Sequence, residues 1–383
     1  MNSTAFLLAA IGFIIMAVFV YSQYPKQWRE NRAFITVLIL CHLVGLSAVV
    51  VIFTVFRNIY HENIRYEISR IGSFYYITTF IQAILFFVRG ISCRTFLFIS
   101  DRTGMPVSKL GKRLISNKVL HSVIIVVLSF TTFIVGYFNI DFLQDTRYEV
   151  AVAADSQEKE LNICLIADIH AGSGTWEYTY DHLVDQIDQS APDVLFIAGD
   201  VFDETTGSSD VDNFVWALNE IKRPKYGIWF VYGNHDGLEE DKLQRLRDAG
   251  VTILQDEMAV IGEDIQLIGC LDPAYRAMEF GELFEKCAPD RDKPIIVLTH
   301  RPKHFRQLAD LGCDLVMAGH THGFNIPQFL GAPLFGDMFS GIQQYGGMAA
   351  VTTSGVSAWG FHYKWPAVSE VVTIHVTFGG GAE

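Results

Sequence analysis

The stretch LNICLIADIH at residues 161–170 decides the fold, because an apolar run there ends abruptly in two polar side chains. Leu161–Ile166 is short and rich in aliphatic residues, which is typical of a strand buried on both faces. Asp168 and His170 follow directly at its carboxyl end. Ligands of open α/β sheets bind beyond the carboxyl ends of the strands, so this pair predicts a binding site.

The same arrangement recurs four times further along the chain. Similar apolar runs predict strands at 194–198, 227–232, 295–299 and 315–318. Their carboxyl ends carry, in order, Asp200 with Asp203, Asn234 with His235, His300, and His320 with His322. Amphipathic helical spacing fills the intervals 179–189, 211–221, 242–249 and 303–311. The alternation predicts an α/β layered domain, and five polar strand ends in order are not expected of purely structural residues.

These side chains are of the types that bind divalent metal ions. Carboxylates and neutral imidazoles suit Mn, Fe or Zn, and no cysteine thiolate belongs to the set. We therefore predict two divalent ions, with Mn as the first expectation and Fe, Zn or Mg as alternatives. Two ions about 3.5–4 Å apart can clamp phosphoryl oxygens and hold an activated hydroxide for in-line attack.

With all five motifs present over residues 161–376, the sequence resembles the calcineurin-like metallophosphoesterase superfamily. It looks most like the membrane-anchored bacterial branch, as indicated by Gly-Asn-His-Asp at 233–236, by Gly319–Gly323 and by Gly-x-x-x-Trp-Gly at 355–360. The resemblance implies a four-layer αββα sandwich with a dinuclear metal centre. The second motif continues as Asp203-Glu204-Thr205, where protein Ser/Thr phosphatases of the superfamily have Asp-Arg-Gly. This departure argues against a protein substrate.

The resemblance also implies a role for each residue at the strand ends. One ion would be held by Asp168, His170 and His322, the other by Asn234, His300 and His320, and Asp200 would bridge the two. His235 would donate a hydrogen bond to the phosphoryl or leaving oxygen instead of binding metal. Asp203 would orient His235, and the acidic loop 204–212 is expected to be a solvated face.

The first 150 residues differ from the rest in charge and hydropathy. They hold 14 Lys+Arg against 7 Asp+Glu, a net charge of +7, whereas the remaining 233 residues hold 15 against 35, a net charge of −20. So negative a second part argues against nucleic acid as a partner, because phosphate backbones are bound by clustered Lys and Arg. The six cysteines show no paired spacing typical of a disulfide framework or a zinc ribbon.

Four apolar runs in the first part predict an all-α, four-helix transmembrane region, at 4–21, 34–56, 71–88 and 120–140. About 20 helical residues cross a hydrocarbon core of roughly 30 Å. Basic residues concentrate between the first and second runs and between the third and fourth, which places those loops in the cytoplasm and the acidic domain outside. His42 and His121 lie within the runs, where packed or interfacial histidines are expected more often than proton relays.

The predicted organisation is a transmembrane anchor over 1–140, a linker over 141–160, a metallophosphoesterase domain over 161–376 and a disordered tail over 377–383. The predicted function is a multi-pass, membrane-tethered phosphohydrolase with an extracytoplasmic catalytic domain. Its expected substrates are phosphodiesters or pyrophosphates, either small molecules or lipid and cell-envelope compounds. The alternative is a non-catalytic membrane receptor or scaffold that retains the fold, which the intact ligand set disfavours. A transporter is disfavoured by the absence of paired charges in the apolar runs.

Overall fold

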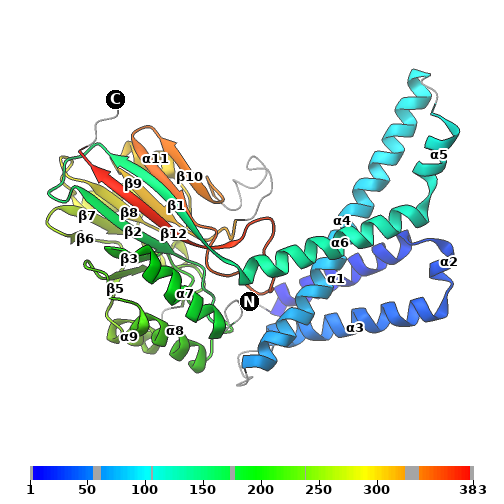
Figure 1. The fold of residues 1–383 in the computed structure, drawn as a ribbon, viewed down its shortest axis with the longest axis horizontal. Helices are drawn as coiled ribbons and strands as arrows, with labels where there is room; N and C mark the ends of the chain where they lie inside the picture. Colours follow the sequence, from blue (N-terminus) through cyan, green and yellow to red (C-terminus); the bar gives the residue numbers. More distant parts are fainter. Residues whose placement is uncertain are drawn as a thin grey trace. The chain divides into compact units, whose positions relative to one another are not determined.

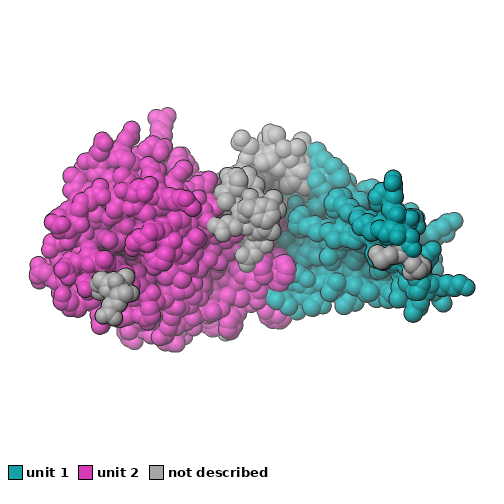
Figure 2. All heavy atoms as spheres, turned by 90° about the horizontal axis from the view of Figure 1, so that it is seen from above, with its two compact units in different colours: residues 1–135 teal, residues 136–383 magenta. Residues whose placement is uncertain are grey.

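The computed structural model of the chain describes residues 3–54, 62–104, 107–172, 177–237, 239–323 and 336–379. Two compact units divide the chain, one of residues 1–135 and one of residues 136–383 (Figure 2). Apolar clusters form within each unit, one in the first and three in the second. Each unit therefore has an interior of its own.

The described residues of the first unit fold into helices. These are α1 (Ser3–Gln23), α2 (Lys26–Arg29), α3 (Arg32–Thr54), α4 (Glu62–Thr103), α5 (Lys109–Ser116) and most of α6 (Lys118–Asp141) (Figure 1). Because no proline interrupts it, α4 continues for 42 residues, well beyond the apolar run predicted at 71–88. Within the described residues, two helices, 67–103 and 118–141, are long and apolar enough to cross a membrane.

Apolar and polar contacts both join the helices of this unit. Val20, Tyr24, Phe86 and Ile125 are buried together. The Tyr24 hydroxyl donates a 2.6 Å hydrogen bond to Gln82 Oε1, which joins α1's end to α4. Such inter-helix hydrogen bonds satisfy polar groups that would otherwise be buried unpaired.

Two mixed six-stranded sheets form the centre of the second unit. The first has the order β1 (Leu143–Val152), β12 (Ser369–Phe378), β2 (Glu160–Ile166), β3 (Val194–Ile197), β4 (Ile228–Val231), β5 (Val251–Leu254). The second has the order β10 (Gly341–Tyr345), β11 (Met348–Thr352), β9 (Leu315–Ala318), β8 (Ile295–Leu298), β7 (Ile265–Gly269), β6 (Glu257–Ile261). The five strands predicted to carry the site are β2, β3, β4, β8 and β9. β2, β3 and β4 pair with one another in parallel in the first sheet, and β8 and β9 do so in the second. Their polar ends therefore lie at one edge of each sheet.

Three apolar clusters show which elements pack on which sheet. One joins the first sheet to α7 (Glu177–Ser190), α8 (Ser208–Glu220) and α9 (Glu240–Asp248). Another lies between the sheets and includes Leu165, Leu267 and Met317, each 0% exposed. The last joins the second sheet to α10 (Phe280–Cys287) and α11 (Phe305–Asp310). The predicted helices are confirmed as α7, α8, α9 and α11.

The structure differs from the sequence-based expectation at both ends of this unit. β1 lies inside the segment 141–160, where we expected an irregular linker, and pairs in parallel with β12. Its buried Val150 and Val152 flank an exposed residue, the two-residue period of a strand with one covered face. β12 continues to Phe378, so it includes the start of the expected tail, and residues 380–383 lie outside the described residues.

Substitution of Leu165 tests the core between the sheets. We expect Leu165→Ala to lower the free energy of unfolding by about 2–5 kcal/mol, because the substitution leaves a cavity among fixed neighbours. Val260→Ala is the control, since that β6 side chain is 52% exposed and its truncation should change stability by no more than about 0.5 kcal/mol. Thermal unfolding of the purified full chain in detergent measures both, and equal shifts in the two variants would contradict the proposed core.

Candidate metal centre

Six of the predicted ligands converge in two groups at the strand ends. Asp168, His170 and His322 place their ligand atoms within 4.8 Å of one another. Asp200, His300 and His320 do the same. These are the groupings that the family resemblance implies, and each combines residues from both sheets. Asp168, His170 and Asp200 follow β2 and β3 of the first sheet, whereas His300, His320 and His322 follow β8 and β9 of the second.

Asp200 lies between the two groups. Its Oδ2 atom is 3.1 Å from His300 Nε2 in its own group and 3.8 Å from His170 Nε2 in the other. Asn234 follows β4, and the backbone N–H of the next residue, His235, donates to Asp200 Oδ1 at 2.8 Å. One carboxylate in reach of both groups is the geometry that a bridging ligand requires.

Buried polar atoms without partners test whether metal ions fit here. Asp168 Oδ1, His170 Nε2 and Asn234 Oδ1 are buried, and none has a hydrogen-bond partner among the described residues. Each unsatisfied buried polar group costs about 1–3 kcal/mol. All three are atoms with which these residue types bind divalent ions, so the residues present fit a pair of divalent ions.

The turns that carry the ligands have an unusual backbone conformation. Five of the seven predicted ligands have φ between 46° and 75°, namely Asp168, His170, Asp200, His320 and His322. Non-glycine residues rarely occupy this left-handed region, and each costs on the order of 1–3 kcal/mol. Close packing of these turns requires small neighbours: a Cβ atom at Gly233 would lie 2.2 Å from Asp200 Oδ1.

Backbone groups fix the orientation of the histidine rings. His300 Nδ1 donates to the Ala198 carbonyl oxygen at 2.7 Å, and His322 Nδ1 donates to the Ser357 carbonyl oxygen at 3.1 Å. Because Nδ1 carries the proton, Nε2 of each ring is the atom free to bind a metal ion. A hydrogen bond from the other ring nitrogen is the usual second contact of a metal-bound histidine.

Asp236 connects the ligand turns, a role that the sequence did not reveal. Its carboxylate accepts hydrogen bonds from the backbone N–H groups of Asp200, Phe202 and Gly233 at 2.6–2.9 Å. Burial, together with the charge of Asp200, raises the pKa of Asp236 to about 7. The only sequence signal for this residue was its place as the fourth residue of the Gly-Asn-His-Asp motif.

Charge pairing sets the protonation of the metal-free centre. Burial disfavours ionisation of Asp200, but the positive charge and hydrogen bond of His300 outweigh burial and hold the Asp200 pKa below its usual range. Burial opposes protonation of His300, yet Asp200 raises its pKa to about 10. Burial and the charge of His300 lower the pKa of His320 to about 3. At neutral pH the metal-free site therefore holds a proton on His300, which metal uptake would release.

His235 lies beside the two groups with a carboxylate on its ring. Its ring centroid is 5.5 Å from that of His170, and its Nδ1 is 3.1 Å from Glu204 Oε1. The hydrogen bond from His235 lowers the pKa of Glu204. Glu204 belongs to the loop that we expected to be a solvated face, and the structure places its carboxylate against His235.

Asp203 lies close to a predicted metal ligand. Its Oδ2 atom is 3.4 Å from His170 Nδ1, and its Oδ1 accepts hydrogen bonds from the Thr205 backbone and hydroxyl. That Asp203 orients His235 stays a prediction. Glu204 is a second carboxylate in a position to orient the His235 ring.

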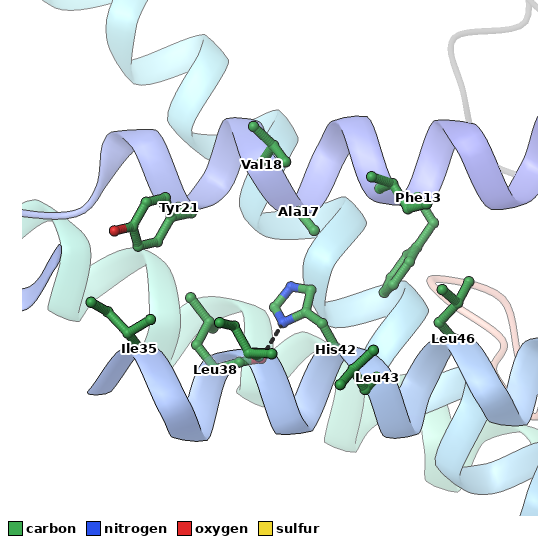
Figure 3. A pocket seen from close by; sticks show the side chains of 11 residues that line it. Phe13, Ala17, Val18, Tyr21, Ile35, Leu38, His42, Leu43 and Leu46 are labelled. Atoms are coloured by element: carbon green, nitrogen blue, oxygen red, sulfur yellow. Dashed lines mark hydrogen bonds between the residues drawn. The ribbon is translucent and has the colours of Figure 1, made fainter. Parts of the chain in front are cut away.

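The helical unit contains a separate pocket of about 520 Å³ between α1 and α3 (Figure 3). Its lining is apolar apart from His42 and Tyr21. His42 Nδ1 donates to the Leu38 carbonyl oxygen of the same helix at 2.8 Å, and the ring lies 5.8 Å from that of Phe13. These contacts are those of a packed histidine, as the sequence predicted.

Comparison with known proteins agrees with the geometry. The profile of the family described as calcineurin-like phosphoesterase matches residues 161–324. An uncharacterized metallophosphoesterase of Helicobacter pylori is 31% identical over 65% of this chain and 70% of its own length. A zebrafish (Danio rerio) transmembrane protein with metallophosphoesterase domain is 28% identical over 56% of this chain and 52% of its own. Phosphodiesterase YaeI of Escherichia coli is 28% identical over 44% of this chain and 65% of its own. With two His/Asp groups converging at its strand ends, the chain belongs to the calcineurin-like metallophosphoesterases and is a hydrolase of that family.

Proposed function

We propose that the chain is a membrane-tethered, two-metal phosphohydrolase that cleaves phosphodiester or pyrophosphate bonds. The observation that carries the proposal is the position of Asp200 between two buried His/Asp groups. The name of the Escherichia coli relative, a phosphodiesterase, favours a diester over a monoester. The substrates would be small or lipid-borne phosphorylated molecules, and Mn would be the preferred ion, with Fe, Zn or Mg as alternatives.

The ligand roles follow from the two groups. One ion would be held by Asp168, His170 and His322. The other would be held by Asn234, His300 and His320, and Asp200 would bind both ions. A pair of divalent ions supplies Lewis-acid stabilisation of phosphoryl oxygens and lowers the pKa of bound water. The protein's part is to fix the imidazole tautomers, to exclude water from the buried carboxylates and to present His235 to the leaving oxygen.

His235 would donate its proton or a hydrogen bond to the leaving oxygen. Its ring is partly exposed and lies beside the ligand groups, so a substrate bound at the ions can reach it. Asp203 would orient the ring or stabilise its protonated form, and the hydrogen-bonded Glu204 could supply the same support.

The anchor would consist of four spans, formed by α1, α3, α4 and α6, with a catalytic domain of four αββα layers outside the cytoplasm. The support for this orientation is the excess of Lys and Arg in the segments between α1 and α3 and between α4 and α6. A receptor or scaffold that has lost activity is the rival, and the intact ligand set argues against it.

Metal content tests the ligand roles. We expect about two ions per chain in the purified wild type, and about one in both His320→Ala and His322→Ala, because each substitution removes a ligand from a different group. His375→Ala is the control, since that β12 histidine belongs to neither group. Elemental analysis after mild chelation and reconstitution measures this; full activity with one ion per chain would contradict the two-metal proposal.

Activity of His235→Ala tests the proton donor. With alkyl leaving groups we expect kcat to fall by about 10²–10⁴-fold with both ions retained, as is usual for loss of general-acid assistance. Nitrophenyl esters should lose least, because nitrophenolate leaves without a proton. The test uses the full chain with defined metals on phosphomonoesters, phosphodiesters and pyrophosphates, where no turnover of any substrate would refute the phosphohydrolase.

Two matched variants distinguish which carboxylate supports His235. Asp203→Asn should cause a smaller defect of the same leaving-group dependence, and its combination with His235→Ala should be little worse than His235→Ala alone. If Glu204→Gln shows that pattern and Asp203→Asn instead loses metal, Glu204 is the orienting residue. Loss of an ion from His235→Ala would make His235 a ligand.

Reporter fusions test the orientation. We expect a reporter at the C-terminus and one inserted around Lys109–Lys118 to lie on opposite sides of the membrane, the C-terminal one outside. A reporter around Lys109–Lys118 that lies outside would show either that the orientation is inverted or that the long helix α4 does not span.

A further inference from the structure

The segment Trp359–Trp365, with the sequence WGFHYKW, contacts His235 at one end and the last turns of α6 at the other. Its backbone repeats every two residues, because the Phe361 N–H donates to the Trp359 carbonyl at 2.9 Å and the Tyr363 N–H donates to the Phe361 carbonyl at 2.8 Å. Such three-residue turns place alternate side chains on opposite sides.

Burial follows the same alternation. His362 and Lys364 are 3% exposed, whereas Trp359, Phe361 and Tyr363 are partly exposed and Trp365 is 50% exposed. The four aromatic side chains are therefore the solvent-reaching members of the segment, and we call them the aromatic path.

One end of the aromatic path lies at the proposed proton donor. The Trp359 ring stacks on that of His235, with centroids 5.1 Å apart and planes inclined by 27°. If His235 contacts the leaving oxygen, the group bonded to that oxygen extends beside Trp359.

The other end is held by the last turns of α6. The Lys364 N–H donates to the Gly136 carbonyl at 2.9 Å, and Asn139 Nδ2 donates to the Ala367 carbonyl at 3.1 Å. His362 Nε2 lies 3.2 Å from Asp141 Oδ1. A Cβ atom at position 136 would lie 2.3 Å from the Tyr363 ring, so glycine permits this approach.

The buried side of the segment is fixed to the metal centre. Lys364 Nζ donates to the carbonyl oxygens of Gly355 at 2.7 Å and Ser357 at 3.1 Å. Ser357 O also accepts from His322 Nδ1, so one carbonyl joins the segment to a predicted ligand. The aromatic path is therefore held at both ends and along its buried side.

From these contacts, and resting on the proposed function, we propose that the aromatic path receives the hydrocarbon part of a membrane-embedded phosphate ester or pyrophosphate. α6 is one of the two helices apolar and long enough to cross a membrane, and the residues of its last turns include Phe138 and, just beyond, Phe142, which are 63% and 64% exposed. Tyrosine and tryptophan at the end of a span are typical of the membrane interface, and Tyr363 of the aromatic path lies against Gly136 of α6. Six residue steps span at most about 20 Å of extended chain, a distance that a lipid chain covers.

The reaction on such an ester is hydrolysis. Water adds its oxygen to phosphorus and loses one proton to the solvent, the P–O bond to the hydrocarbon alcohol breaks, and the leaving oxygen takes the proton that His235 presents and later regains from the solvent. In a pyrophosphate the P–O–P bond breaks instead, and the leaving oxygen belongs to the phosphate that carries the hydrocarbon. The alcohol is released along the aromatic path. The path therefore contacts the leaving alcohol and not the remaining phosphate, so its residues set the preference for the alcohol part of the substrate.

A chain-length series tests the proposal. The full chain in detergent, loaded with Mn, is given phosphodiesters that each carry one methyl group and one linear alkyl group of two to eight carbons, and release of the linear alcohol is measured. Full burial of a methylene is worth about fourfold, so contact with half-exposed rings should raise kcat/KM about twofold per methylene, or roughly 60-fold across the series. We expect Phe361→Ala and Trp365→Ala each to reduce the ratio between the eight- and two-carbon esters by at least about threefold.

Trp216→Ala is the matched control, because this tryptophan is 43% exposed on α8, away from the path, and any effect of detergent on long esters is common to all variants. Its ratio should equal that of the wild type. An active wild type with equal turnover of short and long esters would overturn the proposal, as would unchanged ratios in both path variants. A wild type that hydrolyses these esters no faster than the metal-free protein, but hydrolyses other substrates of the panel above, also overturns the proposal. A wild type that hydrolyses no substrate of that panel refutes the phosphohydrolase itself, which is a different result.

Discussion

Three backbone N–H groups donating to one buried carboxylate hold the metal centre together. Asp236 accepts from the turns after β3 and β4, and so fixes the position of Asp200 between the two ligand groups. Asp200 in turn sets the charge of His300. A buried carboxylate is tolerated only with such a set of donors, since its desolvation is otherwise unfavourable. The Asp236 carboxylate therefore fixes the relative positions of the turns after β3 and β4.

Strain and unsatisfied atoms in the metal-free centre have a common physical meaning. Five ligands in the left-handed region, together with buried atoms that lack partners, make the site less favourable than an ordinary set of loops. The surrounding sheets, with their buried apolar side chains, hold these turns in place. Binding of ions would then recover free energy that the fold alone leaves unsatisfied, which couples metal affinity to the stability of the catalytic unit.

The strand ends could be predicted from sequence because apolar runs and polar residues alternate sharply there. Local pattern was enough for β2 with Asp168, or β9 with His320 and His322. It was not enough for β1, whose mixed composition looks irregular until pairing with β12 covers one face. The contacts of Glu204 and Trp359 with His235 could not be predicted for a related reason, because sequence spacing carries no information on contacts between separate loops. The roles of the seven predicted ligands followed from the family resemblance.

The strand order β1–β12–β2 has a consequence for synthesis of the protein. Leu143 pairs with Ser369 and Glu160 pairs with Thr377, so the strand that joins β1 to β2 is made more than 200 residues after them. Until then β1 has no neighbour and β2 has an open edge, and open edges are templates for pairing with other chains. Contacts of such sequence separation also form slowly. During synthesis of the second unit, the edges of β1 and β2 therefore stay unpaired until β12 has been made. A chaperone that covers these two edges during that time would raise the yield of folded protein.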